Sequence, residues 1–416
     1  MVTGIGAVAP NGVGRERFWD ATRKGRSGVT RVDEFDCSSL PTRIAGTVHD
    51  FDATGLVPRR DLKNLPRTVL MALWAATEAL EDAKLSPAEL DLGQRRRFGV
   101  VIGSGGAGLE FTERQVKEYY TGNPKAVSLY SVPSSTPGSL SSELSMKFDL
   151  RGPSHVLSTG CTSSTDALGH ALSLIRYGRA DRVLGGGTDA PITPSLMTGF
   201  CLLKIMTPSW NTEPQRGSRP FARDRDGFVL AEGSWMLVLE ELQAARERGA
   251  PIYAELLGYG ANCEAFHRVR LRESGEEPAL AMQLALEDAG LPPERIDYLS
   301  LHGTSTQLND RIETRAVRLV FGRRAGALPS SSLKSMIGHP QGACGAASVA
   351  ASLLAMRDRF LPPTINHDEP DPACDLDVVP NLGRAAGLDT VLCNTIGFGS
   401  KNAAVVLGRM ADEPAR

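Results

Sequence analysis

The chain has 416 residues, 41% of them hydrophobic and 23% charged, a composition typical of a globular protein with core enough for two or three domains. The formal net charge of −2 and the lack of any apolar run of about 18 residues give no indication of a nucleic-acid partner or a membrane span. The seven cysteines include no C-x-x-C pair, which argues against a disulfide or zinc framework and favours a reducing compartment, here the cytoplasm.

Apolar strands that end in glycine alternate with helical patterns along the chain. The chain opens on a strand that runs into a glycine turn, MVTGIGAVAP, which is consistent with a natural start upstream of Met1. Continuous apolar runs that suit strands covered on both faces occur at 98–106, 182–190, 296–304 and 390–399. Helical patterns occur at 68–83, 163–178, 278–291 and 344–358. This alternation predicts an α/β fold.

Two of the helical patterns end in nearly the same way. The first ends in EDAKL and the third in EDAGL, each before an apolar strand. The glycine of the second copy is a helix stop signal. These two short matches suggest an internal duplication.

A single cysteine stands where a predicted strand gives way to a helix, in STGCTSSTDALGHAL (158–172). Backbone N–H groups at a helix N-terminus favour the thiolate, so the position predicts a lowered pKa for Cys161. The same N–H groups can hold an oxyanion. On the cysteine alone, a small buried residue that packs a turn is an equally good interpretation.

Two histidines lie at the ends of other apolar segments. His302 follows a strand in SLHGTSTQLND, and His339 lies in the turn of SMIGHPQGACG. In open α/β sheets, sites gather where strands end and loops begin. Lys334 precedes His339, and Asp310 and Glu313 follow His302, so these charged groups could orient the imidazoles. Structural histidines are the alternative interpretation, and a zinc site of one cysteine and two histidines is a weaker one because the spacing fits no finger pattern.

Motifs along essentially the whole chain resemble the β-ketoacyl-[acyl carrier protein] synthases of the elongating Cys-His-His type. The segments that carry the resemblance, in chain order, are VTGIGAVAPNG, GSGGAG, RGPSHVLSTGCTSSTDALGHA, GGTDAPITP, RPFARDRDGFVLAEG, HGTSTQLND, SSLKSMIGHPQGACGA, LPPTIN and NTIGFGSKNAAVVLG. The resemblance implies a thiolase-like fold of two similar α/β halves in five layers, α-β-α-β-α. We expect residues 1–250 to form the half with the nucleophilic cysteine and residues 251–410 the half with both histidines.

The resemblance also implies the reaction. Cys161 would accept an acyl chain from a carrier protein, and His302 and His339 would promote decarboxylation of malonyl-carrier protein and stabilise the enolate. The backbone N–H groups of Cys161 and Phe398 would hold the oxyanion, and the Phe398 ring would act as a gate. No metal or cofactor is implied beyond the phosphopantetheine arm that carries the substrates.

Further roles follow from the same resemblance. Lys334 would pair with Glu313 and support the histidines. Thr304 and Thr306 would contact the pantetheine arm. His267 aligns with a histidine of the family and is expected to belong to the substrate-binding residues. Val269 stands where a contacting threonine is usual, which puts that contact in doubt.

Several residues depart from the fatty-acid enzymes. Gly106 stands where those enzymes often carry a bulky aliphatic gate, so a wider acyl tunnel is expected. The last motif reads GFGSKN instead of GFGGTN, with Lys401 in place of a small polar residue, and the turn after His339 reads PQGACG instead of TLGAAG. GGTDAPITP, SSLKSMIGH and EPDPACDLDVVP are most similar to type II polyketide ketosynthases, so this branch, and within it a polyene-forming subgroup, is favoured over housekeeping fatty-acid elongation.

The polyketide interpretation implies two protein partners. One is an acidic acyl carrier protein, for which a positive patch on the predicted helix start could serve, unless it is only a solvated helix start: Arg59, Arg60, Lys63 and Arg67. The other is a second ketosynthase-like subunit, either a copy of this chain or a chain-length factor that lacks the cysteine. A non-catalytic chain-length subunit disagrees with the presence of Cys161. A stand-alone initiating synthase disagrees with His339, because the resemblance implies an asparagine there, and a thiolase disagrees with the strand context of Cys393.

Overall fold

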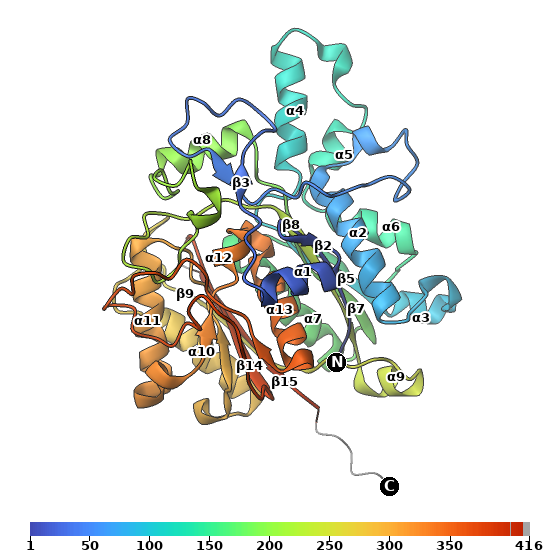
Figure 1. The fold of residues 1–416 in the computed structure, drawn as a ribbon. Helices are drawn as coiled ribbons and strands as arrows, with labels where there is room; N and C mark the ends of the chain where they lie inside the picture. Colours follow the sequence, from blue (N-terminus) through green and yellow to red (C-terminus); the bar gives the residue numbers. More distant parts are fainter. Residues whose placement is uncertain (400, 411–416) are drawn as a thin grey trace.

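The computed structural model describes residues 1–399 and 401–410, which form two β-sheets with helices between and outside them (Figure 1). The six-stranded sheet has the order β2 (Gly12–Val13), β1 (Val2–Ala9), β8 (Gly233–Glu240), β7 (Arg182–Asp189), β5 (Phe98–Gly103) and β6 (Ser154–Leu157). The five-stranded sheet has the order β11 (Ser330–Ser331), β10 (Tyr298–Ser300), β14 (Thr390–Gly397), β15 (Lys401–Gly408) and β9 (Glu255–Cys263). Two small ribbons pair β3 (Thr30–Arg31) with β4 (Ile44–Ala45) and β12 (Phe360–Leu361) with β13 (Arg384–Ala385).

Helices make up the remaining layers. The α-helices are α1 (Arg15–Arg23), α2 (Arg67–Asp82), α3 (Leu92–Arg96), α4 (Leu109–Tyr120), α5 (Ser131–Ser135), α6 (Ser139–Phe148), α7 (Ser163–Arg176), α8 (Pro194–Leu202), α9 (Leu242–Glu247), α10 (Glu276–Ala289), α11 (Gln307–Phe321), α12 (Lys334–Ile337) and α13 (Cys344–Asp358). Short 3-10 turns are η1 (Leu62–Asn64), η2 (Pro87–Glu89), η3 (Pro124–Ala126), η4 (Gly160–Thr162), η5 (Pro214–Arg216), η6 (Pro293–Arg295), η7 (Gly322–Ala327) and η8 (Gln341–Ala343). Across residues 1–399 and 401–410, none of the helices combines the length and the apolar character needed to traverse a bilayer.

The two sheets repeat one pairing pattern. β1, β8, β7, β5 and β6 are joined by two antiparallel and then two parallel pairings, and β9, β15, β14, β10 and β11 are joined in the same way. The expected duplication is therefore present in the fold. The four predicted strands and the four predicted helices are all found, with ends that differ by at most a few residues.

Closely approaching glycines support the duplication. Gly6 in β1 lies against α2, where an added Cβ would stand 1.8 Å from the Ala75 carbonyl oxygen. Gly260 in β9 lies against α10 in the same way, with an added Cβ 2.3 Å from the Ala285 nitrogen. Each sheet thus brings its outer helix to the backbone of its first strand, which a side chain at either glycine would prevent.

Helices α7 and α13 form the central layer. Both contact the six-stranded and the five-stranded sheet, while α2 covers the outer face of one and α10 that of the other. Residues 344–356 of α13 are all buried, and their Ala, Gly and Ser side chains suit a helix with neighbours on every side. The result is the expected five-layer α-β-α-β-α arrangement, with the starts of both central helices at the same end of the molecule's interior.

Candidate active site

Cys161 lies in η4, between β6 and α7, and its side chain is only 5% exposed. Gly160 has a φ of 73°, a conformation that a glycine adopts without strain. The Ser163 hydroxyl donates to the Gly160 carbonyl at 2.6 Å and accepts from the Thr159 N–H at 2.9 Å. These bonds fix the turn that places the thiol at the start of α7.

Burial raises the pKa of the Cys161 thiol to about 12. The neighbouring Cys344 and Asp189 act in the same direction, while Lys334 and the Phe398 N–H oppose them. The lowered pKa expected from the helix N-terminus is therefore wrong, because removing the thiolate from water outweighs the effect of the backbone dipoles. Cys161 is therefore a thiol at neutral pH, and it would have to give up its proton to act as the expected nucleophile.

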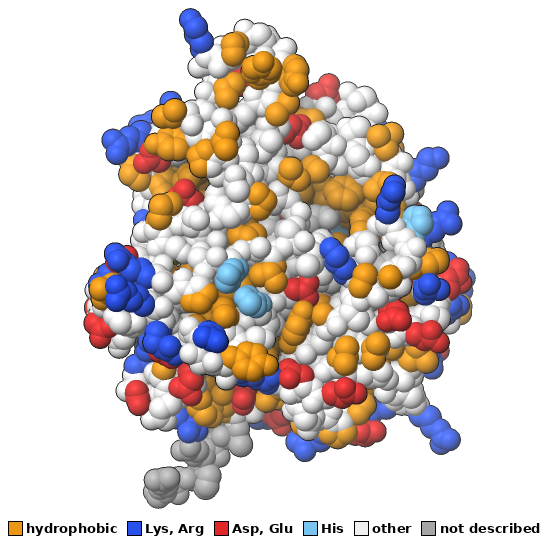
Figure 2. All heavy atoms as spheres, turned by 180° about the vertical axis from the view of Figure 1, so that it is seen from behind, with side chains coloured by type: hydrophobic (Ala, Val, Ile, Leu, Met, Phe, Trp, Pro, Cys, Tyr) orange, Lys and Arg blue, Asp and Glu red, His pale blue; other side chains and the backbone are white. Residues whose placement is uncertain are grey.

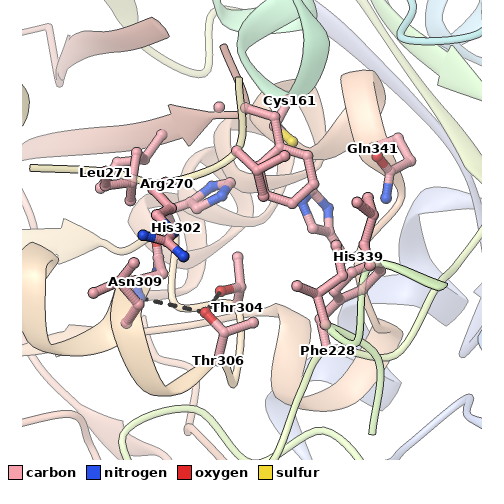
Figure 3. A pocket seen from close by; sticks show the side chains of 17 residues that line it. Cys161, Phe228, Arg270, Leu271, His302, Thr304, Thr306, Asn309, His339 and Gln341 are labelled. Carbon is pink, nitrogen blue, oxygen red and sulfur yellow. Dashed lines mark hydrogen bonds between the residues drawn. The ribbon is translucent and has the colours of Figure 1, made fainter. Parts of the chain in front are cut away.

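The two histidines converge on this thiol from the second sheet (Figure 3). His302 follows β10, and His339 is held by backbone bonds to the segment before β8: its N–H donates to the Val229 carbonyl at 2.7 Å, and its carbonyl accepts from the Ala231 N–H at 3.0 Å. The two rings lie edge to face with centroids 5.3 Å apart. The Cys161 sulfur and one nitrogen of each ring all lie within 4.8 Å of one another.

Both imidazoles are neutral. Burial lowers the pKa of His302 and of His339 well below 6.5, and the cationic Lys334 acts in the same direction on both. A neutral imidazole presents one N–H donor and one lone pair. The pair can therefore donate hydrogen bonds to a developing oxyanion, or accept the thiol proton, without first losing a proton.

Lys334 sets the tautomer of His302. Its Nζ donates to the His302 carbonyl at 2.7 Å and lies 3.3 Å from Nδ1 of the same ring. An ammonium group has no lone pair, so Nδ1 accepts and the ring proton sits on Nε2. The same positive charge disfavours a divalent cation between the cysteine and the histidines, which weakens the zinc interpretation.

The expected pair between Lys334 and Glu313 is wrong for the part of the chain that the structure describes. The Glu313 carboxylate instead accepts from the N–H groups of His302 and Gly303, both at 2.7 Å, and from the Asn394 amide at 2.7 Å. Glu313 is buried under the loop that follows β10, and burial raises its pKa to about 7. Lys334 and Glu313 therefore hold the same loop from two sides without meeting each other.

Phe398 lies directly against the cysteine. Its N–H approaches the Cys161 thiol closely enough to lower the thiol's pKa, and an added Cβ at Gly397 would stand 3.4 Å from the Cys161 nitrogen. The Phe398 side chain is 36% exposed at the pocket. The geometry thus brings together the two N–H groups expected to form the oxyanion hole.

A cavity of about 260 Å³ opens onto this group. Thr304 and Thr306 lie in its wall with their hydroxyl oxygens 3.0 Å apart, and the Thr306 hydroxyl also caps α11 through the Asn309 N–H (Figure 3). Lining residues that the sequence analysis did not assign are Leu203, Ile205, Phe228, Arg270, Leu271, Leu308, Asn309, Gln341 and Ile396. Five of them fall inside motifs of the resemblance, and that location was the only available signal: Phe228, Leu308, Asn309, Gln341 and Ile396.

Gly106 and His267 lie beside the cavity without lining it. The Gly106 N–H donates to Asp189 at 3.0 Å, as do the N–H groups of Gly105 at 2.8 Å and Gly342 at 2.7 Å. Nδ1 of His267 accepts from the N–H of Val269 at 3.0 Å and so shapes an exposed turn, while Val269 itself reaches the cavity. Their expected substrate contacts stay predictions. Lys401 opens β15, and Ser400 of the same motif lies outside the described residues.

Three of the four residues expected to bind the carrier protein are exposed: Arg59, Arg60 and Lys63. Arg67 is different, because its guanidinium forms two bonds to Glu232 at 2.8 and 2.7 Å and a third to the Val48 carbonyl. The sequence could not reveal this partner, which is far away in the chain. Arg67 is therefore engaged in an ion pair while its side chain remains 38% exposed, and its expected part in carrier docking stays a prediction.

Comparison with known proteins identifies the family. Residues 1–245 match the beta-ketoacyl synthase N-terminal domain, and residues 253–368 match the C-terminal domain of the same family. The 3-oxoacyl-[acyl-carrier-protein] synthase 2 of Coxiella burnetii is 40% identical over 412 residues, covering 99% of both chains. The tetracenomycin polyketide synthase ketoacyl synthase alpha subunit of Streptomyces glaucescens is 42% identical over 417 residues, covering 98% of this chain and 96% of the relative.

Solved structures agree with these relatives. A type II polyketide ketosynthase solved with its acyl-carrier protein and a hexaketide superposes with a TM-score of 0.91 at 35% identity, covering 98% of both chains. The ishigamide ketosynthase/chain length factor superposes with a TM-score of 0.89 at 33% identity, covering 99% of this chain and 98% of the other. The chain therefore belongs to the beta-ketoacyl synthase family of condensing acyltransferases, and its five layers are those of the thiolase-like fold.

Proposed function

We propose that this enzyme performs the decarboxylative Claisen condensation of an acyl chain on Cys161 with malonyl-acyl carrier protein in type II polyketide biosynthesis. The observation that carries the proposal is the convergence of the Cys161 sulfur with His302 and His339 nitrogens within 4.8 Å in one buried site. Residues 1–250 and 251–410 serve as the two halves, one with the nucleophile and the other with both histidines.

The first step transfers the acyl chain to the enzyme. The Cys161 sulfur attacks the thioester carbonyl of an acyl-carrier protein, and its proton passes by way of a neutral imidazole to the departing carrier thiolate. Because burial keeps Cys161 protonated, this proton transfer is needed for the attack. The N–H groups of Cys161 and Phe398 stabilise the tetrahedral oxyanion.

The second step forms the carbon–carbon bond. Malonyl-carrier protein loses CO₂, and the released electron pair forms an enolate whose oxygen accepts hydrogen bonds from His302 and His339. The enolate carbon then attacks the Cys161 thioester, which releases the β-ketoacyl-carrier protein and a cysteine thiolate that takes up one proton. Two N–H donors in a site shielded from water suit this oxyanion.

The substrates arrive on a phosphopantetheine arm. The hydroxyl pair of Thr304 and Thr306 lies in the cavity wall, where it can bond the amides of such an arm. His267 acts indirectly by shaping the turn that carries Val269 to the cavity. The reaction as written requires no cofactor on the enzyme.

The polyketide branch is favoured over fatty-acid elongation by two observations. The Streptomyces glaucescens relative and the neighbour solved with a hexaketide are both polyketide ketosynthases. The second is Gly106, which by the resemblance stands where fatty-acid enzymes often carry a bulky aliphatic gate. Housekeeping elongation is the second candidate, and the 40% identity to the Coxiella burnetii synthase favours it.

A second ketosynthase-like subunit completes the proposed enzyme. Strand β6 is the edge of the six-stranded sheet, and Ser154 and His155 on it are exposed. Figure 2 shows hydrophobic side chains gathered on the projecting end of the molecule, where α4 and α5 lie, and these segments expose Tyr119, Tyr120 and Val132. Two named neighbours pair a ketosynthase with a chain length factor, which makes such a homologue the expected partner, with a second copy of this chain as the alternative.

Reconstitution tests the proposal. The chain is purified alone and with candidate chain-length subunits, supplied with malonyl-carrier protein, and examined by intact mass spectrometry for an acyl adduct on Cys161 and for new β-ketoacyl-carrier protein. Successive mass increments of unreduced two-carbon units support the polyketide branch. Extension that proceeds only through fully saturated chains, when the enoyl-reducing enzyme of fatty-acid synthesis is supplied, would contradict it.

A further inference from the structure

The carboxamide of Gln341 lies at the active-site cavity and has no role in the proposed mechanism. It lines the same cavity as Cys161, and Figure 3 shows it on the side of His339 and Phe228, across from His302 and Arg270. Its carboxamide forms no hydrogen bond with any described residue. Gln341 is half-buried, and its primary amide offers two donors and an acceptor that water satisfies in the open cavity and that a bound chain must satisfy once it displaces that water.

The backbone directs this side chain. Gln341 has a φ of 46°, which is uncommon for a residue with a Cβ, and it lies between Pro340 and the buried start of α13. Unusual backbone conformations of this kind persist where the surrounding structure holds them, often at functional sites. The N–H of the neighbouring Gly342 donates to the buried Asp189 carboxylate at 2.7 Å. This bond fixes the backbone of the turn next to Gln341.

Gln341 also faces the loop that contains Gly106. An added Cβ at Gly105 would lie 3.6 Å from the Gln341 Cβ, so the two segments are in contact. Asp189 ties this loop and the Gln341 turn together through the N–H groups of Gly105, Gly106 and Gly342. Figure 3 places Thr304 and Thr306, the proposed contacts of the carrier arm, on another side of the pocket. Gln341 is therefore placed to meet the acyl chain and not the arm.

We infer that Gln341 is a specificity-determining residue whose amide N–H donates to a carbonyl oxygen on the acyl carbons next to the Cys161 thioester. The inference rests on the proposed function and deepens it by naming the substrate class. An acyl chain that keeps its β-keto group satisfies the amide, whereas a saturated chain leaves it unpaired. Sites built to bond a polar group reject the analogue that lacks it, because their own polar group is then left without a partner.

The test compares two small substrates. Octanoyl-pantetheine and 3-oxooctanoyl-pantetheine are supplied separately, and the rate of Cys161 acylation is followed by intact mass spectrometry. The wild-type enzyme is expected to prefer the 3-oxo substrate. Gln341→Met, which keeps the length of the side chain and removes the amide, is expected to reduce the ratio of the two rates roughly tenfold.

The control is Leu203→Met, an apolar exchange in the wall of the same cavity. It is expected to change both rates by a similar factor and so to preserve their ratio. Thermal unfolding of each variant shows whether the fold is retained. An unchanged ratio in a folded, acylating Gln341→Met enzyme overturns the inference alone. Failure of the wild-type enzyme to be acylated by either substrate, or by acyl-carrier protein, overturns the proposed function and this inference with it.

Discussion

The turn before α7 and the turn before α13 occupy corresponding places in the two sheets and hold different side chains. Both follow the edge strand of their sheet, β6 or β11, and both begin a helix of the central layer. The first turn contains Cys161, while the second is preceded by His339 and starts its helix with Cys344, whose thiol donates to the Cys161 carbonyl at 3.2 Å. A duplicated scaffold thus holds the proposed nucleophile at one of these turns and a proposed hydrogen-bond donor beside the other.

The ends of the parallel strands differ in a similar way. After β5, Ser104 and the following glycine N–H groups bond the buried Asp189, which makes that end structural. After the corresponding β10, His302 faces the thiol and is held by Lys334 and Glu313. The comparison teaches that corresponding strand ends of one fold can serve as a brace in one half and as a catalytic arm in the other.

Removing the thiol of Cys161 should have the largest effect on activity. In Cys161→Ala, acyl transfer and condensation should fall by at least about a thousandfold, because no thioester can form. Decarboxylation of malonyl-carrier protein should persist, since both histidines remain. Mass spectrometry of the acylated enzyme measures acyl transfer, and the released CO₂ measures decarboxylation. Full condensation by this variant would contradict the mechanism.

Removing either donor should have the complementary effect. His302→Ala and His339→Ala should reduce decarboxylation by roughly a hundredfold to a thousandfold, the range seen for loss of one oxyanion donor. Some acylation of Cys161 should survive in each, because neither variant removes the thiol or the N–H groups of Cys161 and Phe398 that are proposed to hold the oxyanion. The measurement is CO₂ release alongside the mass of the acyl-enzyme. If both activities fell equally in both variants, the division of roles between the halves would be wrong.

Each half also contains a carboxyl group whose pKa burial raises to about 7, Glu110 near α2 and Glu313 under His302. A raised pKa means that the folded protein binds this proton more tightly than the unfolded chain. The stability that Glu110 contributes is therefore full below its ordinary pKa of 4.5 and is lost as the pH rises through about 7.

Replacing Glu110 with glutamine should reduce the pH dependence of the free energy of unfolding. The part of the stability loss at pH 8.5 relative to pH 4 that is due to Glu110 should reach at most about 3 kcal/mol, so the total loss should be smaller in Glu110→Gln than in wild type by up to this amount. Urea unfolding at the two pH values measures it, with exposed Glu89→Gln as the control. Decarboxylation should be unaffected because Glu110 does not reach the histidines. An identical pH dependence in wild type and Glu110→Gln would show that this carboxyl does not titrate as proposed.

The smallest effect is expected at the surface of the first half. Arg60→Glu with Lys63→Glu should raise the KM for carrier-bound substrate by roughly threefold to tenfold and leave small acyl thioesters unaffected, because rim charges mainly alter encounter. Arg96→Glu reverses an exposed arginine on α3 and serves as the matched control. Equal effects on both substrates, or the same effect in the control, would rule out carrier docking at this patch.

The sequence predicted the elements well because their patterns are local. Apolar strands that end in glycine and small-residue helices such as 344–358 can be recognised within one segment, and the repeated EDA-x-L ending correctly suggested the duplication. The convergence of Cys161, His302 and His339 depended on the resemblance, since no spacing rule connects positions from different sheets.

The errors concern interactions that depend on burial or on distant partners. The pKa of Cys161 depends on how deeply the thiol is buried, which a helix start alone does not indicate. Glu313 satisfies backbone N–H groups instead of Lys334, and Arg67 binds Glu232. Each partner lies on a separate element, so only the folded arrangement could reveal the choice.

The central position of α13 has a consequence for how the enzyme acquires activity during synthesis. Cys161 leaves the ribosome well before His302 and His339, and the latter is fixed only when the chain between α12 and α13 is enclosed by both sheets. A nascent chain therefore carries its thiol without the imidazoles that would activate it. Acyl transfer and condensation should therefore appear only after the segments that carry both histidines and Phe398 have been made and packed against Cys161.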